Sequence, residues 1–284
     1  MEDIKAIDIL FHLFSPAARK RRAAEWEYLP HPWMGQMSSL RHGTDVGKST
    51  AEIVAEMDET GYEKIFIPAV KMWSHRNNKL FRDDSIEEVY EQVQQFPDRF
   101  IGLAGYNPFR ITESLIDVER CVKELGFKGA YVHSLGFNIR QNDRRMYPLY
   151  AKCVELDVPV ISQVGHFMGP LPAEPGRPIY LDEVALEFPK LKFVASHTGW
   201  PWVEEAIAMV WKHENVYMDT VAHVPKYWGP SMVHFMNSFG RDKVLFGTGG
   251  MGMKLFKEGF LAHNLREETY RKVFRENAIK LFKL

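Results

Sequence analysis

The sequence predicts an α/β protein with the fold of a (β/α)8 TIM barrel. Eight short apolar runs, typical of buried strands, alternate with eight segments that have helical spacing. Short buried strands joined by helical crossovers indicate a parallel sheet, and eight such units close into a barrel. No shift in composition marks a boundary, so residues 1–284 are expected to form a single domain. An open doubly wound sheet is the weaker alternative, because no Gly-x-Gly-x-x-Gly follows the first strand.

The predicted strands are short runs that are mostly apolar, several of them rich in Val, Ile and Phe. They cover residues 4–10, 63–69, 100–104, 128–132, 159–163, 191–196, 215–219 and 243–247. The predicted helices cover residues 49–61, 84–96, 112–125, 147–156, 181–188, 203–210, 231–239 and 267–284. Local signals support several of these bounds. Ser49 and Glu52 resemble a helix cap, Gly61 and Gly126 are suited to end helices, and Pro201 suits a first helical turn.

Two long loops are expected, one after the first strand and one after the fifth. The first covers residues 15–47 and contains several Pro and Gly residues. Loops of this length are usually functional lids or disordered, and four large apolar residues favour an ordered lid over the strand ends. These residues are Trp26, Tyr28, Trp33 and Met34. The second loop follows Gln163 and is also rich in Gly and Pro.

The composition bounds the class of protein and its partners. The formal net charge is -1, with 36 basic and 37 acidic residues, so neither nucleic acid nor a membrane is expected as a partner. Cys121 and Cys153 are expected to be free, buried thiols in a reducing cytoplasm. The sequence shows neither a membrane-spanning run nor a signal-peptide pattern, and a cytoplasmic location is expected.

Polar residues follow several of the predicted strands. They include His12, Gln163, His166, His197 and Asp219. In a parallel barrel the carboxyl ends of the strands meet at one mouth, where ligands bind. Several imidazoles and a carboxylate at one mouth favour acid–base catalysis or metal binding. The alternative for each histidine taken alone is a structural role with a satisfied hydrogen bond.

The chain resembles the amidohydrolase superfamily, in the branch that includes aminocarboxymuconate-semialdehyde decarboxylase. The resemblance rests on the segments 7–12, 126–130, 191–197, 200–202, 215–220, 242–248 and 276–282. Further likeness lies in the segments 163–166 and 174–178. The resemblance implies a TIM barrel, a homodimer, and hydrolysis or decarboxylation of a small carboxylated substrate that is cyclic or aromatic.

Three positions depart from the metal site that this resemblance implies. The family usually has a histidine where this chain has Leu10, another where it has Gln163, and an aspartate where it has Gly249. A catalytic zinc site needs about three good protein ligands. The sequence therefore predicts a degenerate metal site and no metal cofactor. The alternative is zinc or manganese held by His12, His166 and His197.

The expected function is that of an amidohydrolase-related enzyme working by histidine acid–base chemistry. The candidate catalytic residues are His166, His197 and Asp219. The candidate substrate-binding residues are His12, Gln163, Arg177 and Trp200, with Arg177 suited to a carboxylate and Trp200 to an apolar pocket wall. Two alternatives stay open: a metal-dependent hydrolase or carboxy-lyase with a replaced ligand set, and a non-catalytic barrel that acts as a binding protein.

Overall fold

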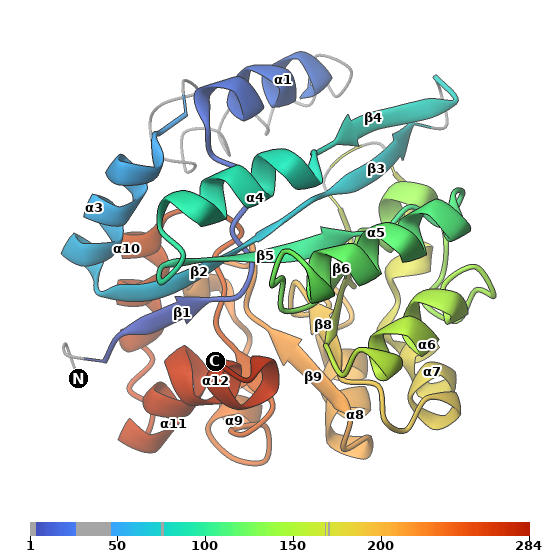
Figure 1. The fold of residues 1–284 in the computed structure, drawn as a ribbon. Helices are drawn as coiled ribbons and strands as arrows, with labels where there is room; N and C mark the ends of the chain where they lie inside the picture. Colours follow the sequence, from blue (N-terminus) through green and yellow to red (C-terminus); the bar gives the residue numbers. More distant parts are fainter. Residues whose placement is uncertain (1–3, 27–46, 75–76, 168, 170) are drawn as a thin grey trace.

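A parallel sheet of eight strands forms the centre of the molecule (Figure 1). The structure is a computed structural model that describes residues 4–26, 47–74, 77–167, 169 and 171–284. The strands, in their order around the sheet, are β1 (Ala6–Asp8), β2 (Tyr62–Pro68), β5 (Phe100–Gly105), β6 (Ala130–Val132), β7 (Val160–Gln163), β8 (Phe193–Ser196), β9 (Val216–Asp219) and β10 (Val244–Leu245). Each prediction of a strand agrees with one of these within a few residues.

Bonds between the segments that follow β1 and β10 close the sheet into a barrel. The amide of Ile9 donates to the carbonyl of Phe246 at 3.1 Å, and the amide of Gly249 donates to the carbonyl of Leu10 at 3.0 Å. The Asp8 carboxylate adds a side-chain link, because it accepts both the amide and the hydroxyl of Thr248. The prediction of a (β/α)8 barrel is confirmed.

Helices surround the barrel and cover its outer face (Figure 1). They are α1 (Pro16–Trp26), α3 (Thr50–Thr60), α4 (Ile86–Gln95), α5 (Ile111–Lys123), α6 (Tyr147–Glu155), α7 (Leu181–Glu187), α8 (Val203–Lys212), α9 (Pro230–Met236), α10 (Met253–Leu261), α11 (Glu267–Arg271) and α12 (Asn277–Phe282). The expected cap at the start of α3 is a capping box between Ser49 and Glu52, and Gly61 ends the helix with φ +73°.

The hydrophobic core has two parts. The larger lies between the sheet and the helices and includes Phe100, Phe193 and Phe246. The smaller fills the barrel and includes Ile7, Tyr131 and further inward-facing residues of the strands. Cys121 and Cys153 are free and buried, as predicted.

Part of the first predicted loop is helical. The expectation of irregular structure over residues 15–47 is wrong for Pro16–Trp26, which forms α1. This segment is rich in Ala, Arg and Lys, which favour helices, and Pro16 is its first residue. Ser15 accepts a hydrogen bond from the amide of Ala18 at 3.1 Å. Residues 27–46, with three of the four residues of the predicted lid, lie outside the described residues.

The structure also contains an antiparallel hairpin that the sequence does not reveal. It consists of β3 (Lys71–Ser74) and β4 (Lys79–Asp83) and follows β2 directly. Figure 1 shows it continuing from β2 on the side away from the N-terminus. The helix predicted over residues 267–284 is interrupted by a π-helical turn, Lys272–Glu276, between α11 and α12.

None of the helices in the described ranges is both long and apolar enough to cross a membrane.

Candidate functional site

The carboxyl ends of three neighbouring strands bring together residues that the sequence singles out. Gln163 and Asp219 are the last residues of β7 and β9, and His197 follows β8 directly. In the register of β7 and β8, Gln163 lies opposite Ser196. These residues therefore share one rim of the barrel, which we call the mouth, and parallel barrels place their active sites at this end.

Asp219 is a buried carboxyl group with one oxygen fixed and the other unpaired. Its Oδ1 accepts hydrogen bonds from the amides of His197 at 2.8 Å and Val221 at 3.0 Å. Its Oδ2 is buried and makes no hydrogen bond among the described residues. Burial raises the pKa of Asp219 to about 7, although the Ser196 hydroxyl and the two amides oppose the shift. The group therefore holds a proton over much of the range up to neutral pH.

The turn after β8 is left-handed and is anchored by Asp219. His197, Thr198 and Gly199 have φ values of +77°, +55° and +78°. Two non-glycine residues in succession in this region are unusual, and such strain is often found at functional sites. The amide of Thr198 donates to the Asp219 carbonyl at 3.2 Å, and the His197 Nδ1 shares a 2.9 Å hydrogen bond with the Ser196 hydroxyl. The His197 ring is therefore held in place at the mouth.

Asp8 is a second buried carboxyl group at the end of β1. It is fully buried and accepts hydrogen bonds from the amides of Leu10 and Thr248, each at 3.1 Å. Burial raises the pKa of Asp8 to about 7, and the charge of Asp219 adds to the rise. Both oxygens of Asp8 accept hydrogen bonds within the fold. Asp8 therefore serves as a structural link between β1 and the segment after β10, where the sheet closes.

The loop after β7 places the remaining predicted residues beside the mouth. The His166 ring packs edge-on against the Trp200 ring with centroids 4.6 Å apart, and its amide donates to the Trp200 carbonyl at 2.9 Å. Burial lowers the pKa of His166, so the ring is mostly neutral at pH 7. The side-chain nitrogen Nε2 of Gln163 donates to the His166 carbonyl at 3.4 Å. Trp200 is 48% exposed.

Arg177 lies in the same loop but is already engaged. Its guanidinium forms an ion pair with Glu205 and lies 5.9 Å from the centre of the Trp202 ring. His12 is half-buried and lies four residues beyond β1. The His12 backbone lies close to Gly250, because a Cβ added at Gly250 would lie 3.9 Å from the His12 amide nitrogen.

Three residues that the sequence did not single out as substrate-contacting lie on the β6 side of the barrel. Tyr131 lies within β6, and His133 follows that strand. The His133 Nδ1 accepts the amide of Gly136 at 2.9 Å, and burial, together with the charges of His197 and Arg82, lowers the pKa of His133 to about 3. Arg82 comes from the hairpin and forms a buried ion pair with Asp84 at 2.6 Å. The sequence gives no sign that Tyr131 or Arg82 could contact a substrate, because Tyr131 stands within an apolar run and Arg82 in a short segment without a clear strand pattern.

The donors at the mouth do not make a complete metal site. Within the described ranges, no three His, Cys, Asp or Glu side chains lie close enough to hold a metal ion together. His12, His166 and His197 are thus not brought together as a ligand set. The unpaired Oδ2 of Asp219 would suit a cation, but a catalytic metal site needs about three protein ligands. The residues therefore offer a partial fit to a metal ion.

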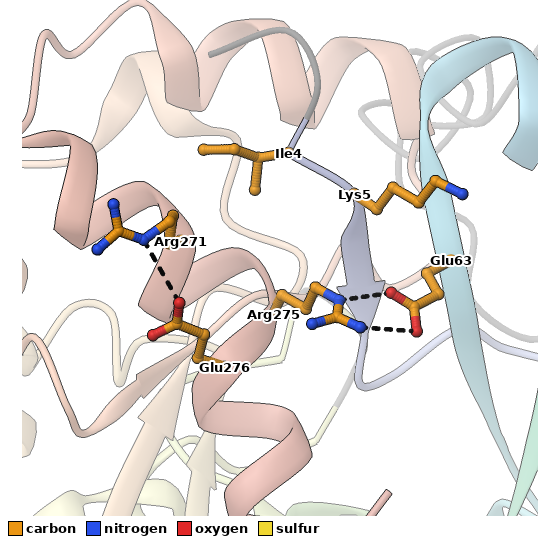
Figure 2. Close-up of a pocket in the computed structure, with 6 residues that line it drawn as sticks. All are labelled: Ile4, Lys5, Glu63, Arg271, Arg275 and Glu276. Carbon is orange, nitrogen blue, oxygen red and sulfur yellow. Dashed lines mark hydrogen bonds and ion pairs between the residues drawn. The ribbon is translucent and has the colours of Figure 1, made fainter.

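A hollow of about 590 Å³ lies at the opposite end of the barrel (Figure 2). It is lined by Ile4, Lys5, Glu63, Arg271, Arg275 and Glu276. Figure 2 shows Arg275 paired with Glu63 and Arg271 paired with Glu276. Conserved chemistry in barrels lies at the carboxyl ends of the strands, so we do not assign the active site to this hollow.

Comparisons with known proteins identify the family and the fold. A family model described as "Amidohydrolase" matches residues 76–284. A 2-keto-4-carboxy-3-hexenedioate hydratase from Sphingobium sp. is 29% identical over 177 residues, which cover 55% of this chain and 48% of the hydratase. The chain thus matches about half the length of that relative. A gamma-resorcylate decarboxylase from Polaromonas sp. is 26% identical over 80% of this chain and 85% of its own length.

Two solved structures share the fold over almost the whole chain. An uncharacterized TIM-barrel protein from Bordetella bronchiseptica has a TM-score of 0.76 and 24% identity, with 98% of both chains covered. A dihydroxybenzoic acid decarboxylase from Polaromonas sp. has a TM-score of 0.71 and 22% identity, with 99% of this chain and 97% of that chain covered. That decarboxylase has bound manganese and an inhibitor, 2-nitroresorcinol.

The expectation of a site without a metal cofactor is wrong in the light of these structures. It rested on counting ligands at the positions of Leu10, Gln163 and Gly249, where the chain lacks the usual residues. The similar decarboxylases, however, hold manganese in their crystal structures. A metal ion can be bound through substrate oxygens and water as well as protein side chains, so a count of protein positions does not exclude it.

Proposed function

The chain belongs to the amidohydrolase family, and on this premise we propose that it decarboxylates a small carboxylated aromatic acid with the help of a divalent metal ion. Gamma-resorcylate decarboxylases are among the relatives that match 80% of the chain, which supports an aromatic acid as the substrate class. Manganese is the first candidate for the metal, because it is the ion in the similar decarboxylase structures.

The observation that carries the proposal is the state of Asp219. Loss of carbon dioxide from an aromatic acid requires a proton at the ring carbon that carries the carboxylate. A general acid works best with a pKa near the operating pH. Burial raises the pKa of Asp219 to about 7, and its Oδ2 is free of hydrogen bonds to the described residues. Asp219 thus combines a proton with a buried oxygen that makes no hydrogen bond to the described residues.

The proposed step moves this proton and breaks one carbon–carbon bond. Asp219 Oδ2 transfers its proton to the ring carbon, and a new C–H bond forms there. The bond between the ring and the carboxylate then breaks, its electron pair restores the aromatic ring, and carbon dioxide leaves. Asp219 is left as a carboxylate and regains a proton from water. The two amides on Oδ1 hold the group in one orientation throughout.

Other residues of the mouth are assigned to binding and proton exchange. His197 and His166 would relay a proton from water to Asp219. Gln163 and His12 would donate hydrogen bonds to substrate oxygens, and the exposed Trp200 would cover the ring. Arg177 would reach a substrate carboxylate only if it left Glu205. The homodimer implied by the family stays a prediction.

Manganese, when bound, would supply positive charge that holds the oxygens of the substrate. The described imidazoles of His197 and His12 are of a type that binds manganese, but they do not complete a ligand set. The steps above are therefore assigned to the protein's own groups.

Hydration of a carboxylated alkene is a second candidate, because one relative is a hydratase that acts on a keto-carboxy-hexenedioate. The same carboxyl group would then work in the opposite sense, with ionised Asp219 taking a proton from water as it adds to the double bond. Product analysis separates the two reactions, since only one releases carbon dioxide.

The test is carbon dioxide release from a panel of aromatic acids that includes 2,6-dihydroxybenzoate and 5-carboxyvanillate, with added manganese. We expect turnover by the natural protein and a loss on the order of 10²–10⁴-fold in Asp219→Asn, because the asparagine keeps the amide contacts but carries no transferable proton. Asp157→Asn is the matched control, since Asp157 is an exposed partner of Lys192 and Lys283.

Undiminished carbon dioxide release by Asp219→Asn would contradict the assignment of the acid. Absence of turnover on every acid, with or without manganese, would favour the hydratase or the non-catalytic binding protein instead.

A further inference from the structure

A buried hydroxyl group without a partner lies inside the barrel. Tyr131 is 1% exposed, and its hydroxyl makes no hydrogen bond among the described residues. A buried polar group normally finds a partner, because leaving it without a hydrogen bond is unfavourable. Its ring belongs to the core cluster that fills the barrel, so the side chain points inward from β6. The described residues offer the hydroxyl no acceptor, which suggests that a ligand supplies one.

The hairpin brings a cation to the same side of the barrel. Arg82 is 7% exposed, and its Nε and Nη2 donate to Asp84 Oδ2 at 2.9 and 2.6 Å. Its Nη1 makes no hydrogen bond to the residues that the structure describes. Asp84 therefore fixes the plane of the guanidinium and leaves one edge of it available.

Three observations show that Arg82 faces the mouth near Tyr131. Arg82 lies opposite Met72 in the hairpin, so the two side chains are on one face. Met72 belongs to the same barrel cluster as Tyr131. A Cβ on Gly136 would lie 3.1 Å from Met72 Cγ, which places this face against the turn Ser134–Phe137 that follows β6. The positive charge of Arg82 also acts on the Tyr131 hydroxyl, and there it lowers a pKa that burial raises.

We propose that Arg82 and Tyr131 form a subsite for an anionic oxygen of the substrate, with Nη1 and the hydroxyl as its two donors. This proposal rests on the proposed function, because it takes an aromatic acid as the ligand. It adds a preference for one kind of substrate that the family assignment does not provide. The preference comes from this chain's own Arg82 on the hairpin and Tyr131 within β6.

The anion at this subsite is a group that stays on the product. The reacting carboxylate becomes neutral carbon dioxide, so a cation bound to it would stabilise the substrate more than the transition state. A second carboxylate keeps its charge throughout the reaction. A cation bound to it therefore stabilises the substrate and the transition state equally. The preferred substrate class is therefore an aromatic acid with a second anionic group.

Binding of two inert probes tests the proposal without any turnover. Isophthalate carries two carboxylates on one ring, and benzoate carries one. Titration calorimetry on the natural protein is expected to show tighter binding of isophthalate, on the order of tenfold, because hydrogen bonds to charged groups are stronger than those between neutral groups. Tyr131→Phe and Arg82→Gln are expected to remove most of this preference while binding benzoate as before.

The controls separate a binding role from a structural one. Tyr131→Phe removes a hydroxyl with no protein partner, so its Tm is expected to be unchanged or higher. If Arg82→Gln fails to fold, Tyr131→Phe alone decides the outcome. Arg275→Gln breaks a two-bond arginine–glutamate pair at the opposite end of the barrel (Figure 2) and should keep the preference for isophthalate.

A preference for isophthalate that survives in Tyr131→Phe, or its absence in the natural protein, would overturn the subsite. Failure of the proposed function looks different: no carbon dioxide would be released from any acid, while the difference between the two probes would still depend on Tyr131.

Discussion

Two buried carboxyl groups with similar pKa values have different environments in this protein. Asp8 has both oxygens bonded within the fold, while Asp219 keeps Oδ2 unpaired. Burial is the largest cause of the raised pKa in both. The difference that matters for chemistry is therefore an oxygen without a hydrogen bond to the described residues, and of these two groups Asp219 has it. This is why we assign catalysis to Asp219 and a structural role to Asp8.

The raised pKa of Asp8 predicts how stability depends on pH. The pKa rises from 3.8 to about 7 on folding, so between these values the folded protein holds a proton that the unfolded chain has released. The stability from this group is complete below about pH 4 and is lost as the pH rises through 7. Asp8→Asn cannot titrate, and asparagine can still accept the two amides.

We therefore expect the free energy of unfolding of the natural protein, relative to Asp8→Asn, to fall between pH 4 and pH 7. Urea denaturation at several pH values, with chelator present, measures this difference. Asp157→Asn is the control, because ion pairs with Lys192 and Lys283 lower the pKa of Asp157 to about 2 and place its titration outside this window. Parallel curves for the natural protein and Asp8→Asn would contradict the raised pKa.

Close contacts between neighbouring strands position the mouth. The end of β5 approaches the end of β2 so closely that a Cβ on Gly105 would lie 1.9 Å from the carbonyl oxygen of Ala69. That oxygen belongs to the backbone and cannot rotate away. The hairpin, which carries Arg82, begins two residues after Ala69. The absence of a side chain at Gly105 thus sets where the hairpin leaves the barrel.

Gly105→Ala is expected to destabilise the protein by about 1–3 kcal/mol or more, because the strand ends must move apart. The midpoint of urea denaturation reports this loss. Gly229→Ala is the matched control, since its nearest neighbour would be the Ser231 hydroxyl at 3.9 Å and its φ of -70° suits alanine. Equal stability of the two variants would show that the strand ends tolerate the extra methyl group.

The whole barrel explains why residues far apart in the sequence act together. Asp8 and Thr248 are 240 positions apart and share two hydrogen bonds where the sheet closes. Closure places the ends of β7, β8 and β9 on the same rim, with the hairpin beside them. The opposite rim holds a hollow whose arginines are paired with glutamates. At the mouth, Asp219 Oδ2 and the Tyr131 hydroxyl make no hydrogen bond to the described residues, whereas the two arginines of the opposite hollow form ion pairs with glutamates.

The fold was predictable from the sequence because each strand is a short, mostly apolar run, and β1, β7, β8 and β9 end in a polar residue. Asp219 and His197 could be named for the same reason, as they follow such runs directly. The hairpin could not be predicted, because Lys71–Ser74 and Lys79–Asp83 are short and contain charged residues, one in the first strand and three in the second. Their pairing is accompanied by packing that only the structure shows, such as that of Met72 against Gly136.

The role of Tyr131 was hidden for a different reason. In the sequence it is an aromatic residue within a buried strand, which is typical of core packing. Only the three-dimensional structure shows that its hydroxyl lacks an acceptor. The metal expectation was wrong because it counted protein ligands alone, whereas the similar decarboxylases hold manganese.

The most direct test is a crystal structure with manganese and an inert aromatic analogue such as 2-nitroresorcinol, the inhibitor in the similar decarboxylase. We predict that the ring lies at the mouth, with its reacting carbon or substituent against Asp219 Oδ2 and the manganese on the same rim. A ligand bound at the hollow beside Arg275, or at the mouth without any contact to Asp219, would contradict the proposed site.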